Sequence, residues 1–313
     1  MIRYLTHNQI DKSLWDECVE QSPDGLVYVW SWYLDAVHPG WEALVEDDYK
    51  AVMPLTSGNK FGVKYLFQPF FTQKFGIFSK NKLSNEEIEA FLTAIPDKFK
   101  FAEFRINTSS SSDDLKDFQT SVHRNIELQL NQEYSVIAEN YHSNTKRDLA
   151  KAKKEGLKAV AAVEPSVIID LFRKNRGQDI KHWGDKEYNR LLGLVKTAQS
   201  HEKCLVLGVN ANNNDKLVAG AFFMISHHKI VFLFSGTDEA NKELHGLTFL
   251  LDYVIEKYSG TDFTLDFEGS DNDGLARFYK GFGGEEKYYR ELKFNKLNKI
   301  YKFALKIFKN NKI

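Results

Sequence analysis

The chain has 313 residues, of which 42% are hydrophobic and 14% aromatic, and its 43 acidic residues nearly balance its 42 lysines and arginines. A chain of this size can bury a large core as one large domain or two ordinary ones, and we favour two. The near-zero net charge excludes the global field of a nucleic-acid binder, so any anion site has to be a local patch.

The cysteines Cys18 and Cys204 lie far apart in the sequence, without metal-ligand spacing. This pattern fits a reducing compartment and argues against a disulfide scaffold or a zinc site, so we interpret both as buried thiols. The first residues lack the apolar core of a signal peptide, and the strongest apolar run, LVAGAFFMI, is too short to cross a bilayer. We therefore expect a cytoplasmic protein that binds no metal.

The first half of the chain has strand patterns on both sides of one helix pattern. Residues 49–55 and 63–79 are predicted strands, 84–99 is a predicted capped helix, and 101–109 is a further strand.

The second half repeats this order. Residues 204–210, 216–225 and 229–236 are predicted strands, 245–260 is a helix that Gly260 ends, and 263–270 is a strand. The recurring order of strand, strand, helix and strand predicts two tandem units, each a mixed, mostly antiparallel sheet flanked by helices.

A helical stretch is expected between these halves, over about 132–202. No low-complexity linker separates the halves. We place the boundary near Asn131, where the helical stretch begins. The expected units are then 1–131 and 132–295, followed by a basic segment over 296–313.

The segment SNTKRDLAKAKKEGL, at 143–157, concentrates positive charge in a chain that is nearly neutral overall. A capping box of Thr145 and Asp148 predicts where its helix starts, and Gly156 predicts where it ends.

Helical spacing places Arg147, Lys151 and Lys154 on one face of this helix. The face is either an ordinary solvated surface or an anion site, at which Asn144, Lys146 and the first-turn amides would help to hold a phosphate. The pattern alone leaves both interpretations open.

Two segments together resemble a known family. The stretch at 143–157 resembles the N-x-R-R-x-I-x-K-A-x-K-x-G segment of the Fem-type peptidyltransferases, relatives within the GNAT superfamily of N-acetyltransferases. The stretch LDFEGSDNDGLARFYKGFGG, at 265–284, resembles the strand, loop and helix that close the second GNAT unit of such proteins.

The resemblance implies two fused GNAT-like units that move an acyl or aminoacyl group directly onto an amine, in a cleft between the units. The donor would be an acyl-CoA or an aminoacyl-tRNA. The cationic helix would face a phosphate-rich donor or acceptor, such as tRNA or a nucleotide-linked precursor.

Two departures from the family pattern narrow this expectation. GNAT enzymes that use acetyl-CoA usually carry an R/Q-x-x-G-x-G/A loop before a helix, whereas ANKELHGLTFLL has only Gly246. This puts coenzyme A binding in doubt. The helical arm of some Fem proteins has no counterpart pattern, which weakens an assignment to cell-wall bridge synthesis.

Tyr279 matches the position of a tyrosine that protonates the leaving group in many GNAT enzymes. Its ordinary pKa of about 10 keeps it a proton donor at neutral pH. The alternative is core packing, because Phe278, Tyr279 and Phe282 lie at helical spacing.

Asp266 and Glu268 are two residues apart on a predicted strand and therefore share a face. In a cleft, one would serve as a base or amine anchor, while Gly269 and Ser270 would allow a ligand to approach the backbone. On a solvent face, both are surface acids.

Gly220 interrupts an apolar strand whose counterpart in GNAT folds directs amides at the acyl carbonyl. By resemblance Gly220 is a candidate oxyanion donor, and a packing glycine is the alternative.

The basic segment over 296–313 has an amphipathic pattern. It predicts either a terminal helix docked on the body, or a peripheral contact with an anionic membrane or a polyanion such as tRNA.

The leading hypothesis is an acyltransferase that uses neither a metal nor a covalent intermediate. The alternative is a non-catalytic module that binds a polyanion or a partner on the same scaffold.

Overall fold

The computed structural model describes residues 1–106, 118–161, 163–211, 216–269 and 271–297. The chain divides into two compact units. Unit 1 contains Met1–Asp24, His38–Val122 and Tyr289–Ile313, and unit 2 contains Gly25–Val37 and His123–Tyr288. These bounds differ from the expected boundary near Asn131, because the chain passes between the units more than once. Residues 298–313 of the expected basic segment lie outside the described residues.

Unit 1 is built from short strands and two longer helices. One sheet has the order β1-β2-β3-β6, and β4, β5, β7 and β14 are successive neighbours in a second sheet. The elements are β1 (Ile2–Leu5), η1 (His7–Gln9), α1 (Lys12–Gln21), β2 (Glu42–Glu46), β3 (Ala51–Leu55), β4 (Ser57–Lys60), β5 (Val63–Phe67), β6 (Phe78–Ser79), α3 (Asn85–Thr93) and β7 (Phe99–Ile106).

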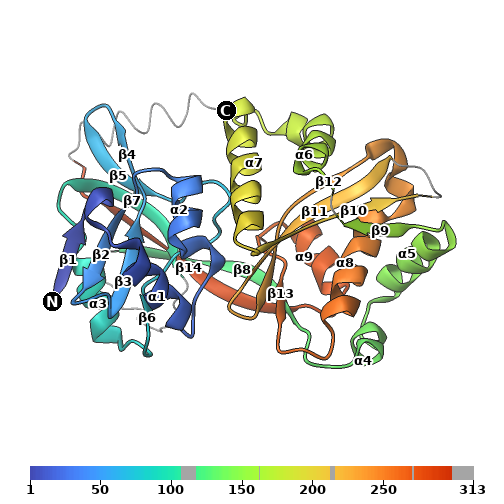
Figure 1. Cartoon of the computed structure of the whole chain (residues 1–313), viewed down its shortest axis with the longest axis horizontal. Coiled ribbons are helices and arrows are strands. Elements are labelled where there is room, and N and C mark those ends of the chain that lie inside the picture. The colour runs from blue at the N-terminus through green and yellow to red at the C-terminus, as the bar shows by residue number, and fades with distance from the viewer. Residues whose placement is uncertain (107–117, 162, 212–215, 270, 298–313) are drawn as a thin grey trace. The chain divides into compact units, whose positions relative to one another are not determined.

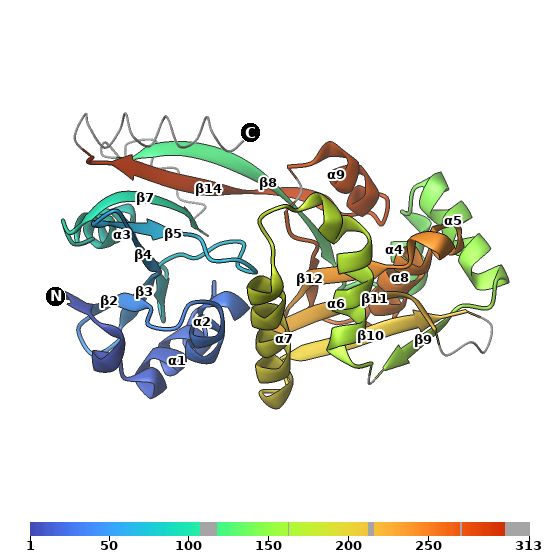
Figure 2. The ribbon, with the colours of Figure 1, turned by 90° about the horizontal axis from the view of Figure 1, so that it is seen from above.

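A parallel pair of strands, β5 and β7, is joined by the crossover helix α3 (Figure 2). The predicted cap of α3 is confirmed, because Ser84 Oγ accepts from the Glu87 amide at 3.2 Å and the Glu87 carboxylate accepts from the Ser84 amide at 2.8 Å. The expected strand over 63–79 is confirmed only at its two ends, as β5 and β6, and is wrong between Phe67 and Phe78. Pro69 and the left-handed backbone of Phe71, with φ of 62°, end the strand and begin a loop.

Unit 2 has the strand order β14-β8-β13-β12-β11-β10-β9. Its strands β8 (Gln119–Gln129) and β14 (Glu285–Asn295) each continue into unit 1. The other elements are η2 (Val27–Val29), α2 (Ser31–Val37), α4 (Tyr134–Glu139), α5 (Ser143–Lys154), β9 (Lys158–Ala161), α6 (Pro165–Lys174), η3 (Arg176–Asp179), α7 (Asp185–Ser200), β10 (Cys204–Asn210), β11 (Leu217–Ser226), β12 (Lys229–Thr237), η4 (Glu239–Leu244), α8 (Gly246–Tyr258), β13 (Thr264–Asp266) and α9 (Asp273–Lys280).

Most predicted elements of unit 2 are confirmed, and two are corrected. Strand β9 interrupts the stretch expected to be helical over 132–202. Strand β13 covers only Thr264–Asp266 of the expected 263–270, because Glu268 adopts a left-handed backbone with φ of 57° that no strand tolerates.

Helices cover both faces of the unit 2 sheet (Figure 1). On one face, α8 begins at Gly246, where an added Cβ would lie 3.0 Å from the Cβ of Ala219. The strands also carry a row of three glycines, because Gly208 pairs with Gly220 and Gly220 pairs with Gly236. On the other face α6 packs on two of them, Gly220 and Gly236. Since glycines lack a Cβ, α6 approaches the strands closely.

Helix α5 is amphipathic, as its sequence predicts. Thr145, Leu149 and Ala152 are buried, and Gly156 follows the helix with φ of 69°. The predicted capping box is wrong: the helix starts at Ser143 with His142 as its N-cap, so Thr145 lies inside the first turn. Its hydroxyl packs against Gly281: a Cβ added to Gly281 would lie only 2.4 Å from Thr145 Oγ1.

Candidate active site

A cluster of polar side chains begins where the pairing of the parallel strands β12 and β13 ends. Their pairing runs from Lys229 opposite Thr264 to Val231 opposite Asp266, after which β12 continues and β13 ends. The carboxyl ends of parallel strands are a common position for ligand sites in open α/β sheets. Asp266 and Glu268 lie at this end of β13.

Asp266 is buried, with 1% of its surface exposed, and it holds the segment that follows. Its Oδ1 accepts from the Glu268 amide at 2.9 Å and from Asn125 Nδ2, also at 2.9 Å. Asn125 is equally buried and comes from the neighbouring strand β8. These bonds help to hold Glu268 in its left-handed backbone, which is costly for a residue other than glycine.

Tyr28 reaches the same place from the N-terminal part of the sequence. It is fully buried, and its hydroxyl donates to the Glu268 carboxylate. Burial and the negative charges of Glu268 and Asp266 raise the pKa of Tyr28 well above its ordinary value, so it stays protonated. Tyr28 thus gives the Glu268 carboxylate a fixed donor, and Glu268 remains half-buried.

The segment carrying Tyr28 is anchored to the turn between β11 and β12. Trp30 Nε1 donates to Ser226 Oγ at 2.9 Å, and that oxygen lies 2.6 Å from His227 Nδ1. Gly25 packs so closely on the His227 ring that a Cβ there would come within 2.2 Å of it. The position of Tyr28 is therefore fixed from both sides.

Tyr279 lies on α9 beside this cluster and belongs to the core of unit 2. Its ring stacks on Phe267 with centroids 4.8 Å apart, and 7% of its surface is exposed. Burial, and secondly the negative charge of Glu268, raise the pKa of Tyr279 above its ordinary value. The catalytic and the packing interpretations of Tyr279 are thus compatible, because the ring packs while the side chain lies near a carboxylate.

The cluster therefore combines a half-buried carboxylate with two tyrosines that keep their protons. A carboxylate can accept a proton from an ammonium group, and a protonated phenol can donate one to a departing oxygen or sulfur. Both cysteines are unsuited to nucleophilic attack at neutral pH, because burial raises the pKa of Cys18 to about 11 and that of Cys204 to about 12.

Gly220 lies away from this cluster, in the glycine row under α6. A Cβ there would meet Ile168 Cγ1 at 2.6 Å and the carbonyl oxygen of Leu207 at 3.2 Å. This contact accounts for the glycine by packing. Its role as an oxyanion donor stays a prediction.

The predicted anion-binding residues Asn144, Lys146, Arg147, Lys151 and Lys154 are all exposed on α5. Several already have partners within unit 2. Lys146 Nζ donates to the carbonyl of Glu139 at 2.8 Å, Arg147 pairs with Asp148 at 3.0 Å, and Lys151 lies 3.8 Å from Glu243.

One lysine of α5 that does not belong to the predicted cationic face has a clear structural role. Lys153 lies 3.3 Å from Asp252, a buried carboxylate on α8. The hydroxyls of Tyr134 and Tyr141 donate to the same carboxylate at 2.8 and 3.1 Å. Part of the charge on α5 therefore stabilises the fold.

The remaining predicted positions are peripheral or outside the structure. Gly269 is exposed, with open space around its α-carbon, and Ser270 lies outside the described residues. The sequence predicts site roles for Asp266, Glu268 and Tyr279, which stay predictions, but it does not point to Asn125 and Tyr28. The only local signal for Tyr28 is the dense aromatic run at 28–33.

Two features are absent from the part of the chain that the structure describes. Among these residues, no group of three histidine, cysteine or acidic side chains is placed to hold a metal ion. None of the helices described is both long and apolar enough to cross a membrane.

The whole chain is similar to several solved structures. A crystal structure of FemX matches with a TM-score of 0.68 and 11% identity, covering 97% of this chain and 99% of that one. A conserved protein of unknown function from Bacteroides thetaiotaomicron matches with a TM-score of 0.58 and 12% identity, covering 94% and 100%. The C-terminal domain of a protein described as a lysylphosphatidylglycerol synthetase from Agrobacterium fabrum matches with a TM-score of 0.54 and 12% identity, covering 94% of each chain.

No protein-family model matches the sequence, and no curated protein matches it either. The structural likenesses, at these low identities, establish the fold. The chain therefore has the two-unit, GNAT-like fold of the Fem type, as its sequence predicts.

Proposed function

We propose that this protein is an acyltransferase that moves an aminoacyl or other acyl group onto an amine, using the cluster of Tyr28, Glu268 and Tyr279. The observation that carries this proposal is the half-buried Glu268 carboxylate at the carboxyl end of β13, which accepts from Tyr28 beside the buried Tyr279. The similar folds support it, because they include FemX and a protein described as a lysylphosphatidylglycerol synthetase.

In the proposed reaction the acceptor amine attacks the acyl carbonyl carbon, so a C–N bond forms. Glu268 takes a proton from the amine, and Tyr279 gives its hydroxyl proton to the leaving oxygen or sulfur as that bond to carbon breaks. Glu268 then releases its proton to solvent and Tyr279 takes one up from solvent, which returns both groups to their starting states. Tyr28 acts as a positioning residue, because its hydroxyl fixes one oxygen of the Glu268 carboxylate.

An aminoacyl ester fits the described residues better than an acyl-CoA as the donor. Coenzyme A would need free amides at the start of α8 for its pyrophosphate. Gly246 instead packs on Val218 and Ala219, and the preceding η4 carries Glu239 and Glu243. Lys242 and Lys151 pair with these two acids, so this segment offers a pyrophosphate no surplus of positive charge.

The test is a single-turnover assay of the purified protein with panels of aminoacyl-tRNAs and acyl-CoAs, each with a set of primary amines. We expect transfer from an aminoacyl-tRNA, reduced about 10²- to 10⁴-fold by Glu268→Gln or Tyr279→Phe. Matched control variants are Glu256→Gln and Tyr253→Phe, which alter exposed side chains of α8. Absence of transfer with every donor, or full activity in Glu268→Gln, would contradict the proposal.

A further inference from the structure

Unit 1 contains a cavity of about 480 Å³ that the proposed reaction does not use. This volume falls in the range of small-molecule sites. Five aromatic side chains line it: Tyr65, Phe67, Phe70, Phe71 and Phe101.

The cavity lies where unit 1 repeats the architecture of the candidate active site. Strands β5 and β7 are parallel and joined by a crossover helix, as β12 and β13 are in unit 2. Phe67 ends β5, and the lining continues into the loop that follows it. Each unit thus has a site at the carboxyl ends of its parallel strand pair, which favours a ligand-binding role for this cavity.

The loop that forms one wall is held in place by hydrogen bonds. Gln68 Oε1 accepts from the Arg105 amide at 3.1 Å, and Gln68 Nε2 donates to the Thr72 carbonyl at 3.2 Å. The Phe75 amide then donates to the Arg105 carbonyl at 2.8 Å, which returns the loop to β7. The cavity is therefore formed before any ligand arrives, and binding would not have to order the loop.

Phe71 is strained in this loop, because its φ of 62° is unfavourable for a residue other than glycine. Strained residues persist where the surrounding structure fixes them, commonly at ligand sites. The aromatic side chain at this position is consistent with a wall built for a ligand.

The charges around the rings indicate which ligand fits. Glu103 and Glu291 line the cavity together with Arg105, which lies 3.4 Å from Glu291. Lys293 in turn lies 2.8 Å from Glu103, so each of these acids has a cationic partner of the chain. Both pairs are partly exposed, and a bound ammonium group can therefore displace such a partner at a small cost. Aromatic faces also attract cations.

We propose that this cavity binds an organic monocation, namely a primary amine or similar ammonium group carried on an aromatic or other apolar body. The apolar body would lie among the five rings, and the ammonium group would face the carboxylates of Glu103 and Glu291. The inference does not depend on the proposed transfer reaction.

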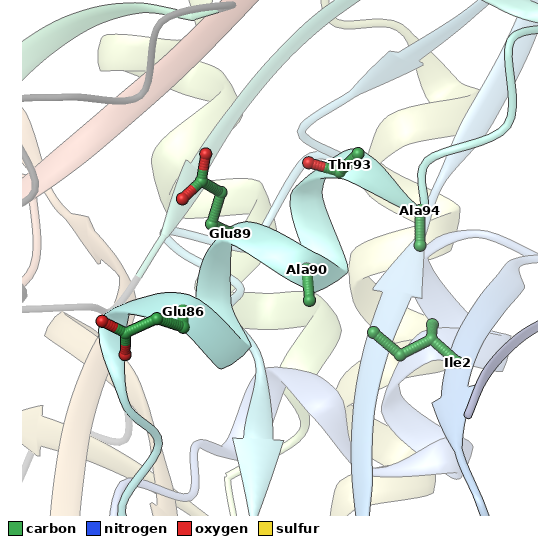
Figure 3. Close-up of a pocket in the computed structure, with 6 residues that line it drawn as sticks. All are labelled: Ile2, Glu86, Glu89, Ala90, Thr93 and Ala94. Atoms are coloured by element: carbon green, nitrogen blue, oxygen red, sulfur yellow. The ribbon is translucent and has the colours of Figure 1, made fainter.

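A second hollow in unit 1 provides a contrast. A shallow groove of about 510 Å³ runs between α3 and β1, with Ala90, Ala94 and Ile2 on its walls (Figure 3). Glu86 and Glu89 line it as well, but it has no aromatic wall. The groove therefore has acidic side chains without aromatic rings. It serves as the internal control for amine binding by carboxylates alone.

The test is isothermal titration calorimetry of the full chain with 2-phenylethylamine, its neutral analogue 2-phenylethanol and its anionic analogue 3-phenylpropionate. We expect the amine to bind at least about tenfold more tightly than either analogue. Glu103→Gln and Glu291→Gln should each weaken amine binding severalfold, while Glu89→Gln in the groove of α3 should not.

A second variant separates binding from folding. Phe71→Gly removes a ring and relieves the left-handed backbone, so thermal stability should be unchanged or higher while amine binding falls. Phe61→Ala removes an exposed ring at the β4–β5 turn and should leave binding unchanged. Equal binding of 3-phenylpropionate, no amine binding at millimolar concentration, or undiminished binding by Phe71→Gly would overturn the proposal.

Discussion

Tyr28 donates a hydrogen bond to Glu268, a residue that follows it 240 positions later in the sequence. This contact joins the segment 25–37 to the loop after β13, and both belong to unit 2. The bond involves a charged acceptor and a fully buried donor, so its loss has a measurable cost.

We predict that Tyr28→Phe lowers the free energy of unfolding by about 2 kcal/mol, the typical value for a hydrogen bond to a charged group. Urea denaturation followed by circular dichroism measures this change. Tyr253→Phe is the control, because Tyr253 is exposed on α8. A Tyr28→Phe variant as stable as the control would mean that Glu268 finds another donor.

The glycine row under α6 gives a prediction about packing. A Cβ on Gly236 would stand 2.3 Å from the Ile168 carbonyl oxygen, which belongs to the helix backbone and cannot rotate away. On Gly220 the nearest atom is the Ile168 side chain, at 2.6 Å. Gly236→Ala should therefore destabilise the fold by about 1–3 kcal/mol, and Gly220→Ala by less.

Thermal unfolding of these variants is compared with Gly193→Ala in α7, where an added Cβ meets nothing within 4 Å. That control should be slightly stabilising, since alanine favours helix. Combining Gly220→Ala with Ile168→Ala should cost less than the two single changes summed. If the double variant folds and keeps transferase activity, the close contact with Ile168 accounts for Gly220.

Asp252 gives a prediction about the cationic helix. Asp252→Ala removes the shared acceptor of Tyr134, Tyr141 and Lys153, and we expect a loss of about 3 kcal/mol. Lys153→Met should cost about 1 kcal/mol or less, because the lysine is half exposed and solvent screens the pair. Lys154→Met, one residue along, is the control. Equal losses in both lysine variants would contradict a specific role for Lys153.

Buried tyrosines make stability fall at high pH. Burial, and then the negative charge of Asp252, raise the pKa of Tyr141 above its unfolded value of about 10. The stabilisation is complete below pH 10 and is lost as the pH rises towards the folded pKa, because the unfolded chain then releases a proton that the folded chain keeps. Unfolding free energies at pH 8, 10 and 11 should decline, and Tyr141→Phe should decline less steeply. A flat profile would refute this linkage.

Local patterns predicted much of the fold but only part of the site. Strand β10 has the predicted bounds, 204–210, because its apolar run stops at turn residues. Strand β9 escaped prediction because Lys158–Ala161 is a short edge strand without a buried stripe. Asp266 and Glu268 were proposed from their spacing on a predicted strand, although β13 ends at Asp266, and Tyr279 from its match to the family pattern. Their catalytic roles stay predictions.

Tyr28 and Asn125 could not be found in this way, since their partners lie far along the chain. The start of α5 was also missed for a long-range reason. The His142 amide donates to the Gly281 carbonyl at 2.9 Å, which fixes the chain ahead of the expected cap at Thr145. Contacts between residues so far apart in the sequence produce no local pattern from which they could be predicted.

The division of the chain has a consequence for how the protein is made and dissected. Residues 25–37 leave the ribosome early, yet Ser226 and Glu268, their partners, are synthesised much later. Unit 2 can complete its assembly only after most of the polypeptide exists, and unit 1 also awaits the strand from Tyr289 onward. No single cut yields either unit as one uninterrupted fragment, so isolating unit 2 would require a peptide spanning 25–37 supplied in trans or a rearranged gene.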